Sequence, residues 1–203
     1  LPGTFEPETV DSYEVGMKTS YLDGRGNFDV TLFMYEYQDM QVINYVEVEE
    51  TGAFAGRVLN VGETDGYGIE ASTTVALSEN FTLYLAAGYL DTEATGIQDI
   101  CGLEDANGCE GSSLFWAPEI TAAGKLDAFF PTSDGAITGS FEISYEGERG
   151  GGWENLSETK IDAFAVANLR VGYESNNNWY VRAYAENLFD EFLLIVTENM
   201  VHL

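Results

Sequence analysis

Hydrophobic and polar residues alternate with a period of two in many separate windows of this chain. Between Tyr13 and Tyr21 the odd positions are mostly apolar or aromatic, whereas Glu14 and Lys18 occupy even positions. Such alternation predicts β-strands with one apolar and one polar face. Eight windows share it: 13–21, 28–34, 69–77, 81–89, 120–128, 137–145, 165–173 and 179–185. No window carries a sustained apolar stripe of helical period, so the predicted class is all-β.

Short and long connections alternate between these windows. The short ones consist of Gly, Asn, Asp and Ser, which tolerate turn geometry. They lie at 23–27, 78–80, 132–135 and 175–178. The long connections are predicted at 39–66, 91–118 and 147–160 and after Asp190. This order predicts an antiparallel up-and-down sheet with short turns at one end and long loops at the other.

Two environments could explain strands with one apolar face. In a soluble sandwich, which would be a secreted binding module, the apolar faces of two sheets meet in a dry core. In an outer-membrane barrel the apolar face meets lipid, the turns are short on one side and the loops long on the other. Aromatic residues near the strand ends, such as Tyr13, Tyr21, Phe81 and Tyr89, favour lipid, because aromatic girdles lie at head-group level. The predicted fold is an up-and-down antiparallel transmembrane β-barrel segment of about eight strands, with short periplasmic turns and long extracellular loops.

Charge excludes one class of partner. The 203 residues contain 35 Asp and Glu against 8 Lys and Arg, a net charge of −27. Nucleic-acid binding is excluded, because it needs Lys and Arg to neutralise phosphates. The acids crowd into the long connections, where they form a solvated face or, alternatively, bind divalent cations. No run has the spacing of a calcium-binding EF-hand loop, so we assign no metal site and no cofactor.

The two cysteines predict a disulfide. Cys101 and Cys109 lie in one polar, glycine-containing stretch, and His202 is the single histidine. A structural zinc site needs about four Cys or His ligands, so zinc is disfavoured. A small disulfide-closed loop implies an oxidising compartment, and two unpaired loop thiols are the alternative. With no histidine in the strands, no nucleophile elbow and no phosphate-binding loop, we assign no catalytic residue and expect no enzyme.

Short blocks along the chain resemble TonB-dependent outer-membrane receptors. The first is PETVDSYEVGMK at 7–18, and the last reaches ENLFDE at 186–191. Further blocks lie in order between them, at 33–41, 60–62 with 66–70, 87–91, 116–119 and 168–173. Each block is short, but their order and spacing cover nearly the whole chain.

The resemblance implies an active transporter in the outer membrane of a Gram-negative bacterium. Such receptors take up ferric siderophores, haem, cobalamin or saccharides, and they are energised through TonB. Their barrel of about 22 strands surrounds an N-terminal plug, so residues 1–203 are expected to form a C-terminal part of the barrel. On this expectation the plug, the earlier strands and the last strand lie outside the sequence. Expected partners are TonB, the plug, outer-membrane lipid, lipopolysaccharide and a small ligand such as a metal chelate.

Candidate site residues fall into two groups. Aromatic residues in or beside the long loops could stack on a ligand or pack within the loops: Tyr45, Phe54, Phe115, Trp116 and Trp153. Charged residues expected to face the barrel lumen could pair with one another or with the plug: Glu14, Lys18, Glu70, Lys125, Asp127, Glu142, Arg170, Arg182 and Glu186. The alternative to a receptor fragment is a complete eight-stranded barrel with an adhesive or structural role, because eight strands can close.

Overall fold

The computed structural model describes residues 5–48, 53–97, 101, 109–153 and 159–191. These residues form two sheets, and each of the eight predicted windows overlaps one strand of the larger sheet. The strands are β1 (Thr9–Tyr21), β2 (Gly26–Gln38), β3 (Gln41–Val48), β4 (Ala53–Asn60), β5 (Glu63–Ala76), β6 (Phe81–Thr95), β7 (Ile120–Thr132), β8 (Gly135–Glu146), β9 (Phe164–Ser175) and β10 (Tyr180–Ala185).

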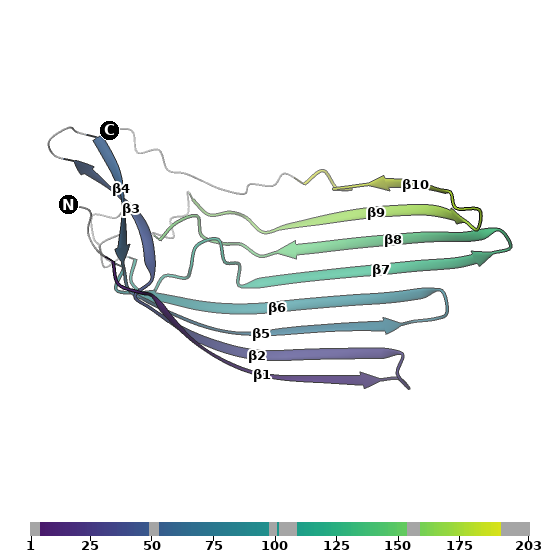
Figure 1. Ribbon diagram of the computed structural model, residues 1–203, viewed down its shortest axis with the longest axis horizontal. Helices are drawn as coiled ribbons and strands as arrows, with labels where there is room; N and C mark the ends of the chain where they lie inside the picture. Colours follow the sequence, from purple (N-terminus) through teal and green to yellow (C-terminus); the bar gives the residue numbers. More distant parts are fainter. Residues whose placement is uncertain (1–4, 49–52, 98–100, 102–108, 154–158, 192–203) are drawn as a thin grey trace.

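Eight of the strands form one antiparallel sheet in the order β1-β2-β5-β6-β7-β8-β9-β10. Figure 1 shows this sheet as a single curved wall, with the tight turns β1–β2, β5–β6, β7–β8 and β9–β10 at one end. The longer connections lie at the other end, which we call the loop rim. The predicted up-and-down arrangement is confirmed.

The pairing register places the apolar residues of neighbouring strands on one face. Val15 pairs with Leu32, Leu32 with Ile69 and Ile69 with Tyr89. Because side chains alternate along each strand, this register puts the apolar set of every strand on the same side of the sheet. We call it the apolar face, and the opposite side the polar face.

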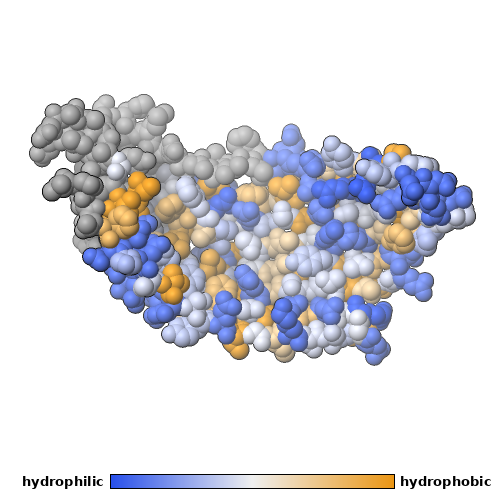
Figure 2. Space-filling model, in the orientation of Figure 1, coloured by the Kyte–Doolittle hydropathy of each residue, from blue (hydrophilic) through white to orange (hydrophobic). Residues whose placement is uncertain are grey.

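The apolar face of the sheet is exposed. Val15 is 67% exposed and Val171 is 48% exposed, although both lie in the middle of long strands. In the described part of the chain no second sheet covers these side chains, whereas a soluble sandwich would bury them. Figure 2 shows strongly hydrophilic side chains at the tight-turn end beside β9 and β10, with hydrophobic patches along the strands. None of the described residues forms a helix with the length and apolarity that a membrane crossing takes.

The long connection predicted at 39–66 contains strands that the alternating pattern did not indicate. It contains the β3–β4 hairpin, which forms its own two-stranded sheet and extends from the loop rim (Figure 1). Val42 and Ile43 belong to a β-branched run that suits a strand. At the base of the hairpin, the Asn60 side-chain amide donates to the carbonyls of Asp39 at 2.7 Å and Glu6 at 2.9 Å. These bonds join the hairpin to the wall.

Most of the buried residues lie at the loop rim, although Ala136 of β8 and Ala167 of β9 are also buried. Ala94, Ile97 and Cys109 are fully buried and form one cluster. Gly62 and Gly96 meet beside it, both with positive φ, and a Cβ on Gly62 would lie 1.9 Å from the Thr95 carbonyl oxygen. Only glycine fits this approach, which holds the end of β4 against the end of β6.

Candidate functional site: the polar wall and the loop rim

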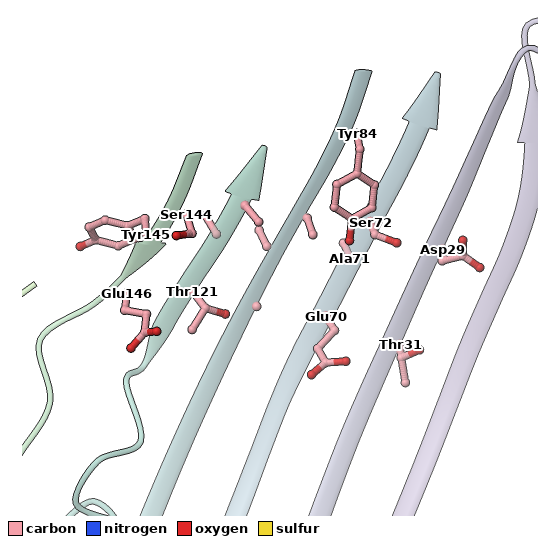
Figure 3. A pocket seen from close by; sticks show the side chains of 15 residues that line it. Asp29, Thr31, Glu70, Ala71, Ser72, Tyr84, Thr121, Ser144, Tyr145 and Glu146 are labelled. Atoms are coloured by element: carbon pink, nitrogen blue, oxygen red, sulfur yellow. The ribbon is translucent and has the colours of Figure 1, made fainter. Parts of the chain in front are cut away.

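The polar face carries a hollow of about 480 Å³ across the centre of the sheet. One row of its lining runs from Thr31 to Glu70, Gly88, Thr121 and Glu146, each paired with the next on the neighbouring strand. Figure 3 shows the Glu70 and Thr121 side chains projecting from β5 and β7, on either side of β6, and Glu146 at the end of β8. The hollow therefore offers carboxylates and hydroxyls to whatever lies against this face.

Small residues make the floor of this polar hollow. Ala86, Gly88 and Ala123 lie on the polar face of β6 and β7. A Cβ on Gly88 would come within 2.9 Å of the Thr121 hydroxyl oxygen, so a side chain there would narrow the hollow. These residues could not be identified from the sequence, because alternation along a strand assigns a side chain to a face but does not say which residues pair across strands.

Ion pairs occupy the polar face between the hollow and the tight-turn end. Glu142 lies 3.3 Å from Arg170 and 3.8 Å from Lys125, so it links β7, β8 and β9. The other pairs on this face are Lys18–Asp29 at 3.3 Å, Lys125–Asp127 at 3.2 Å and Arg182–Glu174 at 2.8 Å. Of the nine charged residues predicted to face the lumen, Lys125, Asp127, Glu142 and Arg170 pair with one another, whereas Lys18 and Arg182 pair with Asp29 and Glu174, which were not in the predicted set.

Three of the predicted lumen-facing acids stand apart from these pairs. Glu14 and Glu70 lie on the polar face, opposite Phe33 and Gly88. Among the described residues neither has an ion-pair partner. Glu186 follows the end of β10 and lies outside the paired strands.

The disulfide lies at the loop rim. Cys101 and Cys109 are joined, with their Cα atoms 5.8 Å apart. The bridge packs in the buried cluster with Ala94 and Ile97. Beside it, the Glu110 carboxylate accepts hydrogen bonds from the backbone N–H of Gly96 at 3.0 Å and of Ile97 at 3.3 Å. Together these contacts fasten the rim segment to the end of β6.

Three of the five aromatic candidates form one cluster at the rim. The Phe115 ring meets Trp116 edge-on at 4.9 Å and Trp153 edge-on at 4.8 Å. Trp153 packs against the buried cluster, whereas Trp116 is 50% exposed. The Trp116 backbone N–H donates to the Gly150 carbonyl at 2.9 Å, and its φ is +63°. A rigid base thus presents the Trp116 ring to solvent.

The other two aromatic candidates lie in the hairpin. Tyr45 pairs with Gly56 and Phe54 with Glu47, but their side chains fall outside what the structure describes. Ligand contact by Tyr45 and Phe54 therefore stays a prediction. Within the described ranges no three His, Cys, Asp or Glu side chains converge in a way that could hold a metal ion.

Comparison with known proteins identifies the family of this wall. Residues 1–188 match the family model described as "TonB dependent receptor-like, beta-barrel". The chain belongs to this family. Members are β-barrels of the Gram-negative outer membrane, so the apolar face of the sheet faces lipid and the polar face lines the lumen.

Similar proteins in this family include receptors for metal chelates. The chain is 26% identical to the metal-pseudopaline receptor CntO of Pseudomonas aeruginosa, over 92% of this chain and 24% of the relative. It is also 26% identical to the ferric-pyoverdine M114 receptor PbuA of Pseudomonas sp. strain M114, over 93% of this chain and 22% of the relative. The chain thus spans about a quarter of the length of these relatives.

Solved structures share the fold. The ferric yersiniabactin uptake receptor FyuA of Yersinia pestis matches with a TM-score of 0.72 at 18% identity, over 92% of this chain and 26% of that chain. The ferric preacinetobactin receptor BauA of Acinetobacter baumannii matches with a TM-score of 0.67 at 19% identity, over 92% and 26% of the two chains. At this level of sequence identity, the structural similarity shows only that the chains share the fold of the barrel wall.

Proposed function

We propose that this chain is part of the barrel of an outer-membrane receptor that actively imports a scarce nutrient, energised through TonB. The observation that carries the proposal is the family match over residues 1–188. Relatives named for metal-pseudopaline and ferric-pyoverdine support a metal chelate as the imported ligand. Ferric siderophores come first among the candidates, followed by haem, cobalamin and saccharides. TonB, the plug, outer-membrane lipid and lipopolysaccharide are the proposed partners, and the chain's place in the C-terminal part of the barrel stays a prediction.

The polar wall suits the lumen of such a receptor. Ion pairs such as Glu142–Arg170 give the polar face a charged surface that suits contact with water. The polar hollow, with Glu70 free of an ion-pair partner among the described residues, leaves polar groups available to a plug or to water moving past it.

Open edges argue against the alternative of a complete eight-stranded barrel. Within the described strands no pairing joins β1 to β10, which lie at opposite ends of the sheet order. Unpaired backbone groups are costly in lipid, so both edges need neighbouring strands. Additional strands of a larger barrel would supply them.

At the rim, Trp116 is the strongest candidate for ligand contact. Its ring is exposed, and its backbone is already held by the hydrogen bond to the Gly150 carbonyl. Stacking on a ligand therefore costs little conformational entropy of the backbone. Phe115 contacts Trp116 and is itself in contact with Trp153, and ligand contact by all three stays a proposal. The flat faces of the ring suit the planar or apolar parts of a chelate.

Uptake by intact cells tests the transport proposal. Cells carrying the full-length receptor are supplied with radiolabelled iron bound to a panel of siderophores, with and without TonB. We expect uptake of at least one chelate that needs both the receptor and TonB. Uptake that persists without TonB would contradict energised transport, and no receptor-dependent uptake of any siderophore in the panel would contradict a ferric siderophore as the imported ligand.

Binding measured on the purified full-length receptor tests the Trp116 contact. Trp116→Ala is expected to weaken binding of the transported chelate about tenfold, equivalent to about 1.4 kcal/mol. Trp179→Ala is the matched control, because Trp179 is 51% exposed but lies at the tight-turn end. Equal affinity of both variants and the unmodified receptor would exclude Trp116 from the site.

A further inference from the structure

A second hollow lies on the apolar face, away from both the lumen and the loop rim. Its volume is about 480 Å³. Small residues of three neighbouring strands form its floor: Ala71 of β5, Ala87 of β6, and Ala122 and Gly124 of β7. The three alanines are paired in one row, Ala71 with Ala87 and Ala87 with Ala122. We call this the lipid-side hollow.

Larger side chains surround the lipid-side hollow on every side. Leu85 and Ile143 both approach Gly124. A Cβ on this glycine would lie 3.4 Å from a methyl carbon of each. The row nearer the loop rim carries Ile69, Tyr89 and Ile120, and the row beyond Leu85 and Gly124, toward the turns, carries Leu83, Leu126 and Phe141. The hollow is therefore a local depression in a surface of bulky residues.

The chemistry of the lining matches hydrocarbon. Apart from backbone, the polar groups at the hollow are the Thr73 and Tyr145 hydroxyls, and Thr73 already donates to the Asn27 carbonyl at 2.9 Å. The hollow is continuous with the lipid-facing surface of the barrel. If the depression were unfilled, the side chains that line it would lose dispersion contacts. A flexible acyl chain is the neighbour that can enter.

A polar group stands above the hollow at head-group level. Ala87, Tyr89 and Asp91 follow one another on the apolar face of β6, so Asp91 lies about 13 Å from Ala87 along the strand. The Asp91 carboxylate accepts hydrogen bonds from the Tyr67 hydroxyl at 2.6 Å and the Tyr89 hydroxyl at 3.4 Å. These bonds hold the carboxylate beside the aromatic girdle, where lipid head groups lie.

We propose that the lipid-side hollow binds one acyl chain of an outer-leaflet lipid whose head group donates to Asp91. The head group carries an ammonium or a hydroxyl, because both groups donate hydrogen bonds and a carboxylate accepts them. The bound lipid covers β5, β6 and β7 on their outer side. The site rests on the membrane position of the wall and is independent of what the receptor imports.

Lipid titration of the full-length receptor tests the site. The receptor is purified in detergent, stripped of lipid and titrated with dimyristoyl phosphatidylethanolamine, and bound lipid is counted by native mass spectrometry. We expect one lipid to bind more tightly than the rest. Ala87→Leu with Ala122→Leu fills the hollow and should weaken that binding about tenfold. Ala183→Leu on β10 is the matched control, since Ala183 lies on the apolar face outside the hollow, and it should leave binding unchanged.

Two further measurements keep the test decisive. Ala87→Leu alone serves if the double variant does not fold, and Asp91→Asn should weaken binding of the same lipid while leaving the hollow open. Unchanged binding in the hollow-filled variant would overturn the proposal. The proposal would also be overturned if the receptor were a dimer and the hollow-filling substitutions converted it to a monomer. The hollow would then be occupied by a second copy of the receptor and not by a lipid.

Discussion

Glu36 of β2 and Asp65 of β5 face each other directly across their strand pairing, on the apolar face of the sheet. The arrangement continues on both sides, since Asp11 pairs with Glu36 and Asp65 pairs with Glu93. Four neighbouring strands thus carry four carboxylates in one row. The row lies two residues beyond Tyr13 and Tyr67, toward the loop rim. Like charges placed directly opposite each other destabilise a sheet.

Neutralising the centre of this row should stabilise the barrel. Asp65→Asn removes repulsion from both Glu36 and Glu93, so we expect a gain of about 0.2–1 kcal/mol for each relieved pair. The urea-unfolding midpoint of the full-length receptor in detergent measures it. Glu63→Gln is the control, because Glu63 pairs with the uncharged Gln38 and Thr95. Equal midpoints for the two variants at low salt would contradict the repulsion.

Charge on the apolar face should prevent stable insertion. Val171→Arg places a cation in the lipid-facing part of β9 and should cost about 2–4 kcal/mol near the bilayer midplane. Thr82→Arg is the control on the polar face, where Thr82 pairs with Asp127 and the uncharged Ala76. Unfolding free energies in lipid vesicles compare the two variants. A Val171→Arg protein as stable as the control would show that the faces are assigned wrongly.

Removing Glu142 should destabilise the polar wall more than removing a carboxylate with one partner. Glu142→Gln leaves Arg170 without an ion pair, and Lys125 keeps Asp127. Exposed pairs contribute about 0.2–1 kcal/mol each, so the loss should be near the top of that range. Glu174→Gln breaks the single pair with Arg182 and provides the comparison. A larger loss for Glu174→Gln in chemical unfolding would refute the ranking.

The contact between Gly62 and Gly96 should tolerate no side chain. Gly62→Ala would drive a methyl group into the Thr95 carbonyl, so we expect a loss of about 1–3 kcal/mol through overpacking. Gly24→Ala tests the conformational part alone, because Gly24 also has a positive φ but nothing within 4 Å of its Cβ position. Limited proteolysis of the loop rim, followed by mass spectrometry, should detect release of the β3–β4 hairpin in Gly62→Ala only. Equal protease sensitivity of the two variants would contradict the contact.

The faces of the strands could be predicted from the sequence because alternation is local. Leu85 and Val171 belong to the apolar set of their strands, and pairing places both on the apolar face. The β3–β4 hairpin was missed because the acids around Glu49 made the segment read as a solvated loop, although its valines suit a strand.

Pairing across strands could not be predicted in the same way. The hollow between Glu70 and Thr121, the carboxylate row through Glu36, and the contact of Phe115 with Trp153 depend on register or on loop packing. Each joins residues far apart in sequence, and a register shift of one residue would move every side chain to the other face.

The mass of the native protein in the outer-membrane fraction distinguishes a large transport receptor from a small complete barrel. An antibody raised against a peptide from this chain would reveal it on a denaturing gel. Because the chain spans 24% of the CntO relative, the account predicts a band several times larger than 22.3 kDa. A band at 22.3 kDa would instead mean a complete small barrel, and it would contradict the assignment to a transport receptor.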